Sequence, residues 1–237
     1  MTSLTGLLRG WVHRWRARGT DEYVRWLCSV QGGWLTPGNV RAFDRAVREM
    51  PDGGAIVEIG SFLGLSTNIL VYLAIKHQRR HRVYSCDPWC FEAAEEPIGG
   101  FFDAGSPAFR DYARQVFVLN ASTFCGERKP FTVEARSDRF LELWARSADA
   151  EDVFGRTVRL GGPVSFAYVD GAHAYDAVRA DVAALDPQLM PGGFLFLDDS
   201  AEGAGFQGVT RVARETQRNP AYELVFESPN HLFRKRR

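Results

Sequence analysis

Short apolar runs alternate with helix-patterned segments along most of this chain of 237 residues, and no other feature limits the possible folds as strongly. Such alternation is typical of a parallel sheet that is covered by helices. The predicted strands are residues 55–60, 82–87, 131–135, 164–170 and 193–198. The predicted helices that follow them are residues 66–78, 107–120, 137–147, 176–185 and 209–219.

The two ends of the chain differ from this repeating pattern. Residues 221–236 contain two alternating strands around a Ser-Pro-Asn turn, which predicts an antiparallel hairpin. Residues 1–32 have a helical pattern, and we expect a helical extension that packs on the domain or on a second subunit. A helix on a membrane surface is the alternative. Because no repeat or low-complexity linker follows, residues 33–237 should form one domain.

The composition excludes several classes of protein. The chain is 45% hydrophobic with a formal net charge of zero, which argues against a general nucleic-acid binder. No apolar run approaches the roughly 20 residues that span a membrane, and the N-terminus lacks the apolar core and cleavage site of a signal peptide. The four cysteines form no CxxC pair, so we expect free thiols in a cytoplasmic protein.

A glycine-containing loop, "VEIGSFLGLST" at residues 57–67, joins the first predicted strand to its helix. A dinucleotide-binding loop has a glycine where the backbone approaches the pyrophosphate, but Phe62 stands at that position. The loop therefore suits a nucleoside-bearing ligand without a pyrophosphate better than NAD. Glu58 suits a cationic group, and Asp87, which ends the second strand, suits ribose hydroxyls. A tight turn that needs its glycines only for backbone reasons is the alternative.

Three aspartates stand where two later strands end. Asp170 ends the fourth predicted strand, Asp198 ends the fifth, and Asp199 follows directly. Neighbouring strands lie about 4.8 Å apart, and carboxylates this close repel one another unless a cation lies between them. Mg²⁺ prefers such oxygen ligands, so the three aspartates predict a metal site. Alternatively, Asp170 positions cofactor or substrate, while Asp198 and Asp199 cap the following segment.

Two further features point to the acceptor side of a reaction. His173 follows the fourth strand, and its ordinary pKa near 6.5 makes it a candidate catalytic base beside Asp170. A structural hydrogen bond that holds the loop is the other interpretation. Residues 89–106 combine aromatics with paired glycines, which suits a mobile lid over an acceptor pocket or an ordinary surface excursion.

Several of these stretches together resemble a known family. They are "VEIGSFLGLST" (57–67), "YSCDPW" (84–89), the run from "FAYVDGAHAYDAVRAD" to "FLFLDDS" (166–200) and the closing hairpin. They resemble the class I S-adenosylmethionine-dependent methyltransferases. More narrowly, they are similar to the small O-methyltransferases that include macrocin-type and cephamycin-type relatives. The resemblance covers roughly residues 33–235.

The resemblance implies an α/β fold with a doubly wound, seven-stranded, mostly parallel sheet and a C-terminal antiparallel hairpin, the Rossmann-like methyltransferase fold. It places Glu58 and Gly60 at the methionine end of S-adenosylmethionine and Asp87 at its ribose. Ser137 and Asp138 match positions beside the adenine. The positions implied to bind the cofactor are Glu58, Gly60, Ser61, Gly64, Ser66, Thr67, Asp87, Ser137, Asp138 and Asp170.

The resemblance also bears on the metal. Related families hold a divalent ion with acids at the positions of Asp170, Asp198 and Asp199. The sequence departs from the macrocin-type pattern nearby, since that pattern has a further acid where Ala172 or His173 stands here. From the resemblance as a whole, we expect S-adenosylmethionine and Mg²⁺ as cofactors.

The expected activity is methyl transfer to a hydroxyl of a small molecule, such as a sugar, a phenol or another natural product. We expect no nucleic-acid or membrane partner, and a homodimer is possible. A metal-independent methyltransferase is the nearest alternative. An NAD-type oxidoreductase is less favoured because of Phe62 and the closing hairpin. A catalytically inactive relative is disfavoured by its intact acids and glycine, namely Glu58, Gly60, Asp87, Asp170 and Asp198.

Overall fold

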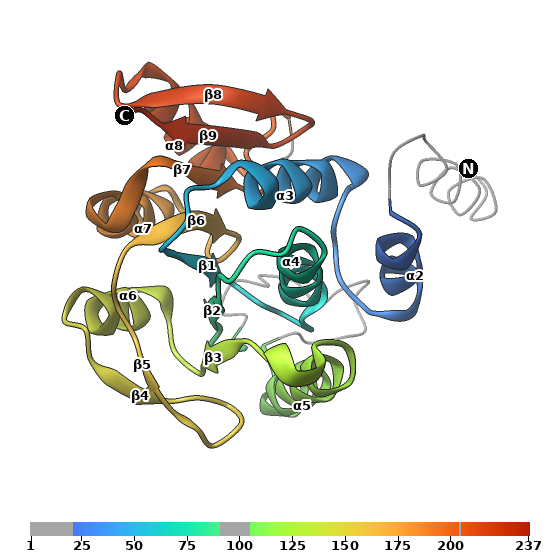
Figure 1. Cartoon of the computed structure of the whole chain (residues 1–237). Coiled ribbons are helices and arrows are strands. Elements are labelled where there is room, and N and C mark those ends of the chain that lie inside the picture. The colour runs from blue at the N-terminus through green and yellow to red at the C-terminus, as the bar shows by residue number, and fades with distance from the viewer. Residues whose placement is uncertain (1–20, 91–104, 204) are drawn as a thin grey trace.

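The computed structural model describes residues 21–90, 105–203 and 205–237, and its centre is a seven-stranded sheet (Figure 1). The strand order is β3-β2-β1-β6-β7-β9-β8. All neighbouring strands from β3 to β7 are parallel, whereas β9 is antiparallel to both β7 and β8. The strands are β1 (Ala55–Ile59), β2 (Val83–Cys86), β3 (Phe131–Val133), β6 (Val164–Val169), β7 (Leu189–Leu197), β8 (Tyr222–Glu227) and β9 (His231–Lys235). This architecture confirms the predicted fold, including the antiparallel hairpin.

Helices cover both faces of this sheet (Figure 1). One hydrophobic core lies between the sheet and helices α2, α3, α4 and α5, and the other between the sheet and α6, α7 and α8. The helices are α2 (Glu22–Val30), α3 (Pro37–Glu49), α4 (Leu65–Lys76), α5 (Pro107–Phe124), α6 (Ser137–Ala145), α7 (Tyr175–Leu185) and α8 (Gln207–Arg218). Short 3₁₀ turns occupy Gly126–Arg128 and Asp186–Gln188.

The central strands feed both cores because their side chains alternate. In β6, Phe166 and Tyr168 belong to the core under α3 and α4, whereas Ala167 and Val169 belong to the core under α6 to α8. All six residues of β6 are buried. Burial on both faces explains why the sequence shows a continuous apolar run here instead of an apolar-polar alternation.

The structure differs from the predicted elements in several places: β3 ends at Val133 instead of residue 135, and α5 continues to Phe124 instead of residue 120. Strand β7 begins at Leu189, four residues before the predicted start, because the Pro-Gly-Gly segment at 191–193 continues the strand instead of ending it. A small antiparallel hairpin, β4 (Asp149–Glu151) with β5 (Thr157–Arg159), was not predicted. Its strands have three residues each and mostly exposed, charged side chains, so they carry no apolar signal.

Helix α2 is the described part of the predicted N-terminal extension. Its Val24 and Leu27 are buried in the core that also contains α4. Residues 1–20 lie outside the described part of the chain, so the predicted boundary at residue 32 stays a prediction. The predicted lid lies largely outside it as well, since 91–104 are not described.

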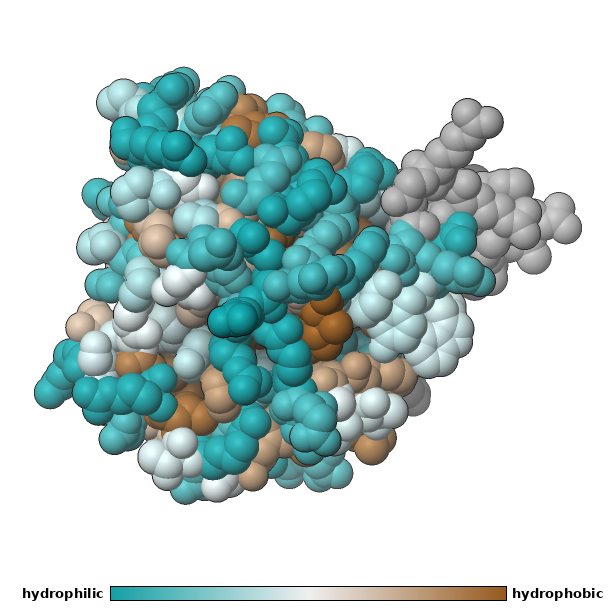
Figure 2. Space-filling model, viewed as in Figure 1, coloured by the Kyte–Doolittle hydropathy of each residue, from teal (hydrophilic) through white to brown (hydrophobic). Residues whose placement is uncertain are grey.

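The hydropathy of the surface and of the described helices agrees with the composition of the sequence. Hydrophilic residues predominate on the face that Figure 2 shows, with small hydrophobic patches between them. Among the described helices, none is long and apolar enough to cross a membrane. All four cysteines are free thiols.

Candidate functional site

The strand register brings the predicted site residues to one edge of the sheet. Ile59, the last residue of β1, lies opposite Cys86 of β2 and Val169 of β6. Val169 in turn lies opposite Leu197 of β7. The residues that follow these four strand ends, and that therefore share the carboxyl edge, are Gly60, Asp87, Asp170 and Asp198.

The glycine loop turns sharply against the end of β6. Gly60 has a φ of 86°, and a Cβ atom there would lie 2.0 Å from the carbonyl oxygen of Asp170. Glycine is therefore required for both backbone conformation and space. Gly64, with a φ of 88°, precedes the first turn of α4. Phe62 also has a positive φ, 44°, which a residue with a side chain seldom adopts.

Asp87 holds this loop from the neighbouring strand. Its Oδ2 accepts hydrogen bonds from the backbone N–H groups of Ser61 and Phe62 at 2.8 and 2.7 Å. Its Oδ1 accepts one from the N–H of Trp89 at 2.6 Å. Burial raises the pKa of Asp87, while the three N–H donors act in the opposite direction. Asp87 thus fixes the position of the glycine loop.

Glu58 is fully buried at the end of β1. Its two carboxylate oxygens accept hydrogen bonds from the hydroxyls of Ser66 and Thr67, each at 2.5 Å, in the first turn of α4. Burial raises the pKa of Glu58 to about 7, although both hydroxyl bonds lower it. A positive charge nearby would favour the ionised form of this carboxyl, so the position suits a cationic group.

A buried polar cluster lies at the ends of β6 and β7. The Tyr168 hydroxyl is within hydrogen-bond distance of the Asp170 carboxylate, at 2.8 Å, and also of the Asp198 carboxylate. Burial, and next the charge of Asp198, raise the pKa of Asp170 well above its usual range. Burial likewise raises the pKa of Asp198 to about 6.

Asp170 also belongs to a second, partly exposed group with His173 and Asp199. One possible ligand atom from each lies within 4.8 Å of the others. His173 Nε2 is 3.1 Å from Asp199 Oδ2. Of the three aspartates predicted to bind a metal, the structure therefore places Asp170 and Asp199 together with His173. Asp198 points into the buried cluster instead.

The predicted adenine-side residues lie at the start of α6. Ser137 is its first residue, and its hydroxyl donates a hydrogen bond to Asp181 of α7. The Asp138 side chain is largely exposed. Both residues follow β3, which lies beside β2, so they share the edge of the sheet with Asp87. Their contact with an adenine stays a prediction.

Sequence reasoning missed several residues of this edge. Tyr168 could have been found, because it lies two residues before Asp170 in a strand and so shares its face. Asn39 and Asn230, which bond Asp198, are 159 and 32 residues away from it in the chain, so no local pattern links them. Trp34, 73% exposed, stacks on Phe62 with ring centroids 5.0 Å apart. This contact brings the segment before α3 over the glycine loop.

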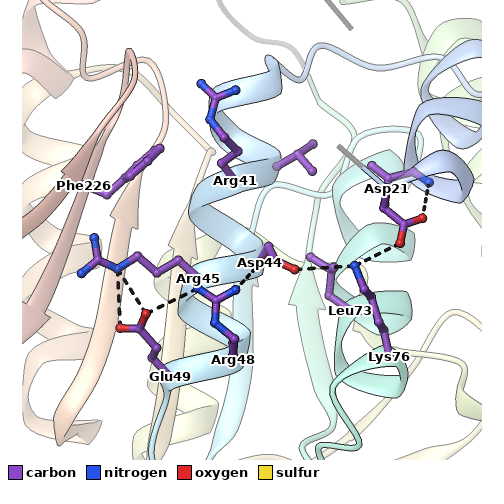
Figure 3. Close-up of a pocket in the computed structure, with 11 residues that line it drawn as sticks. Asp21, Arg41, Asp44, Arg45, Arg48, Glu49, Leu73, Lys76 and Phe226 are labelled. Atoms are coloured by element: carbon purple, nitrogen blue, oxygen red, sulfur yellow. Dashed lines mark hydrogen bonds and ion pairs between the residues drawn. The ribbon is translucent and has the colours of Figure 1, made fainter. Parts of the chain in front are cut away.

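A groove of about 500 Å³ lies elsewhere, between α2, α3, α4 and β8 (Figure 3). Several of its charged side chains form ion pairs: Arg48 lies 2.8 Å from Asp44, and Lys76 lies 3.0 Å from Asp21. None of the residues that line it belongs to the glycine loop or to the aspartate groups. We therefore assign the functional site to the carboxyl edge of the sheet.

Comparisons with known proteins identify the family of the chain. Residues 57–200 match the family model described as a methyltransferase domain, which is more than half of the chain. The chain belongs to the methyltransferase domain family. This confirms the resemblance to class I S-adenosylmethionine-dependent methyltransferases. The matched segment begins in β1 and ends just after Asp198 and Asp199, so it contains the whole carboxyl edge described above.

Solved structures share the fold of this methyltransferase at low sequence identity. The calicheamicin methyltransferase CalS11 is 16% identical with a TM-score of 0.57, over 94% of this chain and 83% of CalS11. An O-methyltransferase from Bacillus cereus, solved in complex with SAH, is 12% identical with a TM-score of 0.52 over 97% of both chains. The SAH-bound Podospora anserina methyltransferase PaMTH1 is 12% identical with a TM-score of 0.57, over 100% of this chain and 96% of PaMTH1. A comparison with curated protein sequences gives no match.

Proposed function

We propose that this methyltransferase transfers a methyl group from S-adenosylmethionine to a hydroxyl of a small molecule, assisted by a divalent metal. The observation that carries the proposal is the glycine loop held by Asp87 beside the buried Glu58. The SAH-bound relatives with the same fold support this choice of cofactor. The side chain of Phe62 opposes a pyrophosphate at the loop, which makes NAD a poor alternative.

The residues suit the parts of S-adenosylmethionine in turn. Glu58 would attract the ammonium of the methionine end, because the positive charge stabilises its ionised form. Asp87 accepts three backbone hydrogen bonds. A carboxylate offers about four acceptor sites, so one remains for a ribose hydroxyl. Ser137 and Asp138, after the next strand, would lie beside the adenine.

Methyl transfer needs little beyond alignment and removal of one proton. The bond between methyl carbon and sulfur breaks as the carbon–oxygen bond forms, and the acceptor hydroxyl loses its proton. Alignment of the two reactants accounts for much of the rate. We propose that the acceptor oxygen lies near Asp170, His173 and Asp199, whose lone pairs can take or direct that proton.

The donor set at this edge fits a divalent metal. Carboxylate oxygens of Asp170 and Asp199 and an imidazole nitrogen of His173 approach one another, and each is a known ligand type. Such an ion would lower the pKa of the acceptor hydroxyl. A metal-independent enzyme is the second candidate, favoured by the 3.1 Å contact between His173 and Asp199, which can act as a base and its orienting carboxylate.

For the acceptor, the relatives suggest a natural-product hydroxyl. CalS11 is described as a TDP-rhamnose 3'-O-methyltransferase in calicheamicin biosynthesis. We propose a small-molecule acceptor for this enzyme too, a sugar or a phenol, in a cytoplasmic protein.

The test is a methyl-transfer assay with a panel of nucleotide sugars and phenols, read by a mass gain of one methylene. We expect turnover with at least one acceptor, loss of turnover with a chelator, and recovery with a divalent metal. Calorimetry under chelation should still show cofactor binding, since Glu58 and Asp87 do not need the ion. Full turnover under chelation would instead establish the metal-independent alternative.

A further inference from the structure

The carboxylate of Asp198 is already saturated with hydrogen bonds. The side-chain amide of Asn39 donates to both of its oxygens, at 2.8 and 2.7 Å. The amide of Asn230, the hydroxyl of Tyr168 and the backbone N–H of Asp199, at 2.9 Å, donate as well. A carboxylate offers about four acceptor sites, so binding a metal ion would require Asp198 to lose several of these bonds.

Those bonds have a structural purpose. Asp198 is 5% exposed, and Asn39 and Asn230 are 1% and 4% exposed. Asn39 lies in the first turn of α3, and Asn230 in the turn between β8 and β9. Asp198 therefore ties a helix and a hairpin turn to the end of β7. Breaking these bonds would leave buried polar groups without partners, which would destabilise the fold.

His173 occupies the place that a third ligand needs. His173 lies three residues after Asp170, in the loop that follows β6. Asp199 lies in the turn after β7 and has a positive φ of 52°. His173 Nε2 lies 3.1 Å from Asp199 Oδ2, and both are within 4.8 Å of the Asp170 carboxylate. The His173 ring is also held from the side by the Phe206 ring, at 4.1 Å between centroids.

We infer that the metal of this enzyme is bound by Asp170, His173 and Asp199, and that Asp198 is a positioning residue that does not touch it. The inference rests on the proposed function, whose metal site it specifies. It replaces the ligand set predicted from the sequence, which consisted of three aspartates. It also makes His173 a metal ligand instead of the catalytic base.

A ligand set of two carboxylates and one imidazole prefers different metal ions from a set of three carboxylates. Imidazole suits first-row transition metals, whereas Mg²⁺ prefers oxygen ligands alone. We therefore expect Mn²⁺, Fe²⁺ or Zn²⁺ to bind more tightly than Mg²⁺. Mn²⁺ is the practical probe because its EPR signal reports directly on a bound nitrogen.

The experiment measures Mn²⁺ binding to the full chain, without acceptor and without turnover. We expect a ¹⁴N coupling from one imidazole in the pulsed EPR spectrum and at least tenfold weaker binding in His173→Ala. His77→Ala is the matched control, because His77 also lies beside an aspartate, 2.8 Å from Asp44, but away from the carboxyl edge. The control should keep both the affinity and the coupling.

Asp198→Asn and Asn39→Ala complete the test. Both should lower the melting temperature, while Mn²⁺ affinity in the folded protein changes by less than about threefold. The inference is overturned if Mn²⁺ binds without a ¹⁴N coupling, or if His173→Ala keeps wild-type affinity; the proposed methyl transfer would survive either result. If no metal binds at all, the inference fails together with the metal part of the proposal. Calorimetry of cofactor binding then tests the other part of the proposed function, the use of S-adenosylmethionine.

Discussion

At the scale of single residues, the buried carboxyl of Glu58 determines how the enzyme should respond to pH. Its pKa is raised by burial to about 7 from an ordinary value of 4.5. Protonated Glu58 is therefore favoured in the free protein below pH 7. Without a ligand, burial of the Glu58 charge does not lower the free energy of unfolding below pH 4.5, where the carboxyl is protonated in both states. The destabilisation grows as the pH rises and is complete above about pH 7. A bound ammonium would reverse this preference by favouring the ionised form.

We predict that S-adenosylhomocysteine binds about tenfold more tightly at pH 8 than at pH 6. The factor follows from the fraction of Glu58 that is ionised on either side of a pKa of about 7. Calorimetry in two buffers with different ionisation enthalpies measures both the affinity and the proton release. Glu58→Gln should bind more weakly and lose the pH dependence. If the affinity of that variant still changes with pH as in the wild type, Glu58 does not bind the cofactor.

Asp87 holds the glycine loop, and we propose that it also binds the ribose of the cofactor. We predict that Asp87→Ala weakens cofactor binding by about 1–3 kcal/mol, or roughly 10- to 100-fold, because hydrogen bonds to a charged acceptor are lost. Calorimetry provides the measurement. Asp186→Ala is the control, since Asp186 accepts a bond from Tyr222 and lies 3.1 Å from Lys235, away from the loop. If both variants weaken binding equally, the effect is a general loss of fold.

At the scale of elements, α3 is locked against the turn between β8 and β9. A Cβ atom on Gly38 would lie 1.4 Å from the carbonyl oxygen of Ser228. We predict that Gly38→Ala lowers the free energy of unfolding by about 2–4 kcal/mol, measured by urea denaturation. The control Gly162→Ala has a φ of 90° but nothing within 4 Å, so it should cost only about 1–2 kcal/mol of backbone strain. Equal costs would show that α3 can move away from the turn.

The elements also show how far the sequence could predict the structure. Buried strands such as β1 and β6 have continuous apolar runs, and the hairpin of β8 and β9 alternates around a clear turn, so the sheet was predictable. The short, charged β4 and β5 gave no such signal. The sequence predicted that Asp170, Asp198 and Asp199 lie at one edge of the sheet, but it could not show that Asp198 points into the buried cluster. That direction depends on Asn39 and Asn230, which only the folded chain brings near.

At the scale of the whole molecule, two hydrophobic cores on opposite faces hold the sheet, and the proposed site lies at its carboxyl edge. The glycine loop follows β1, Asp87 follows β2, and the aspartate groups follow β6 and β7. Segment 31–36 crosses above the loop, where Trp34 stacks on Phe62. This arrangement places the predicted cofactor residues and the proposed metal ligands along one edge of the sheet, as a transfer between two bound molecules requires.

The most direct test of this account is calorimetric titration of the purified full chain with S-adenosylhomocysteine, and with NAD in parallel. The account predicts one site with a dissociation constant in the low micromolar range, about −7 to −8 kcal/mol, and no heat from NAD. Tight binding of NAD, with no binding of S-adenosylmethionine or S-adenosylhomocysteine at millimolar concentration, would contradict it.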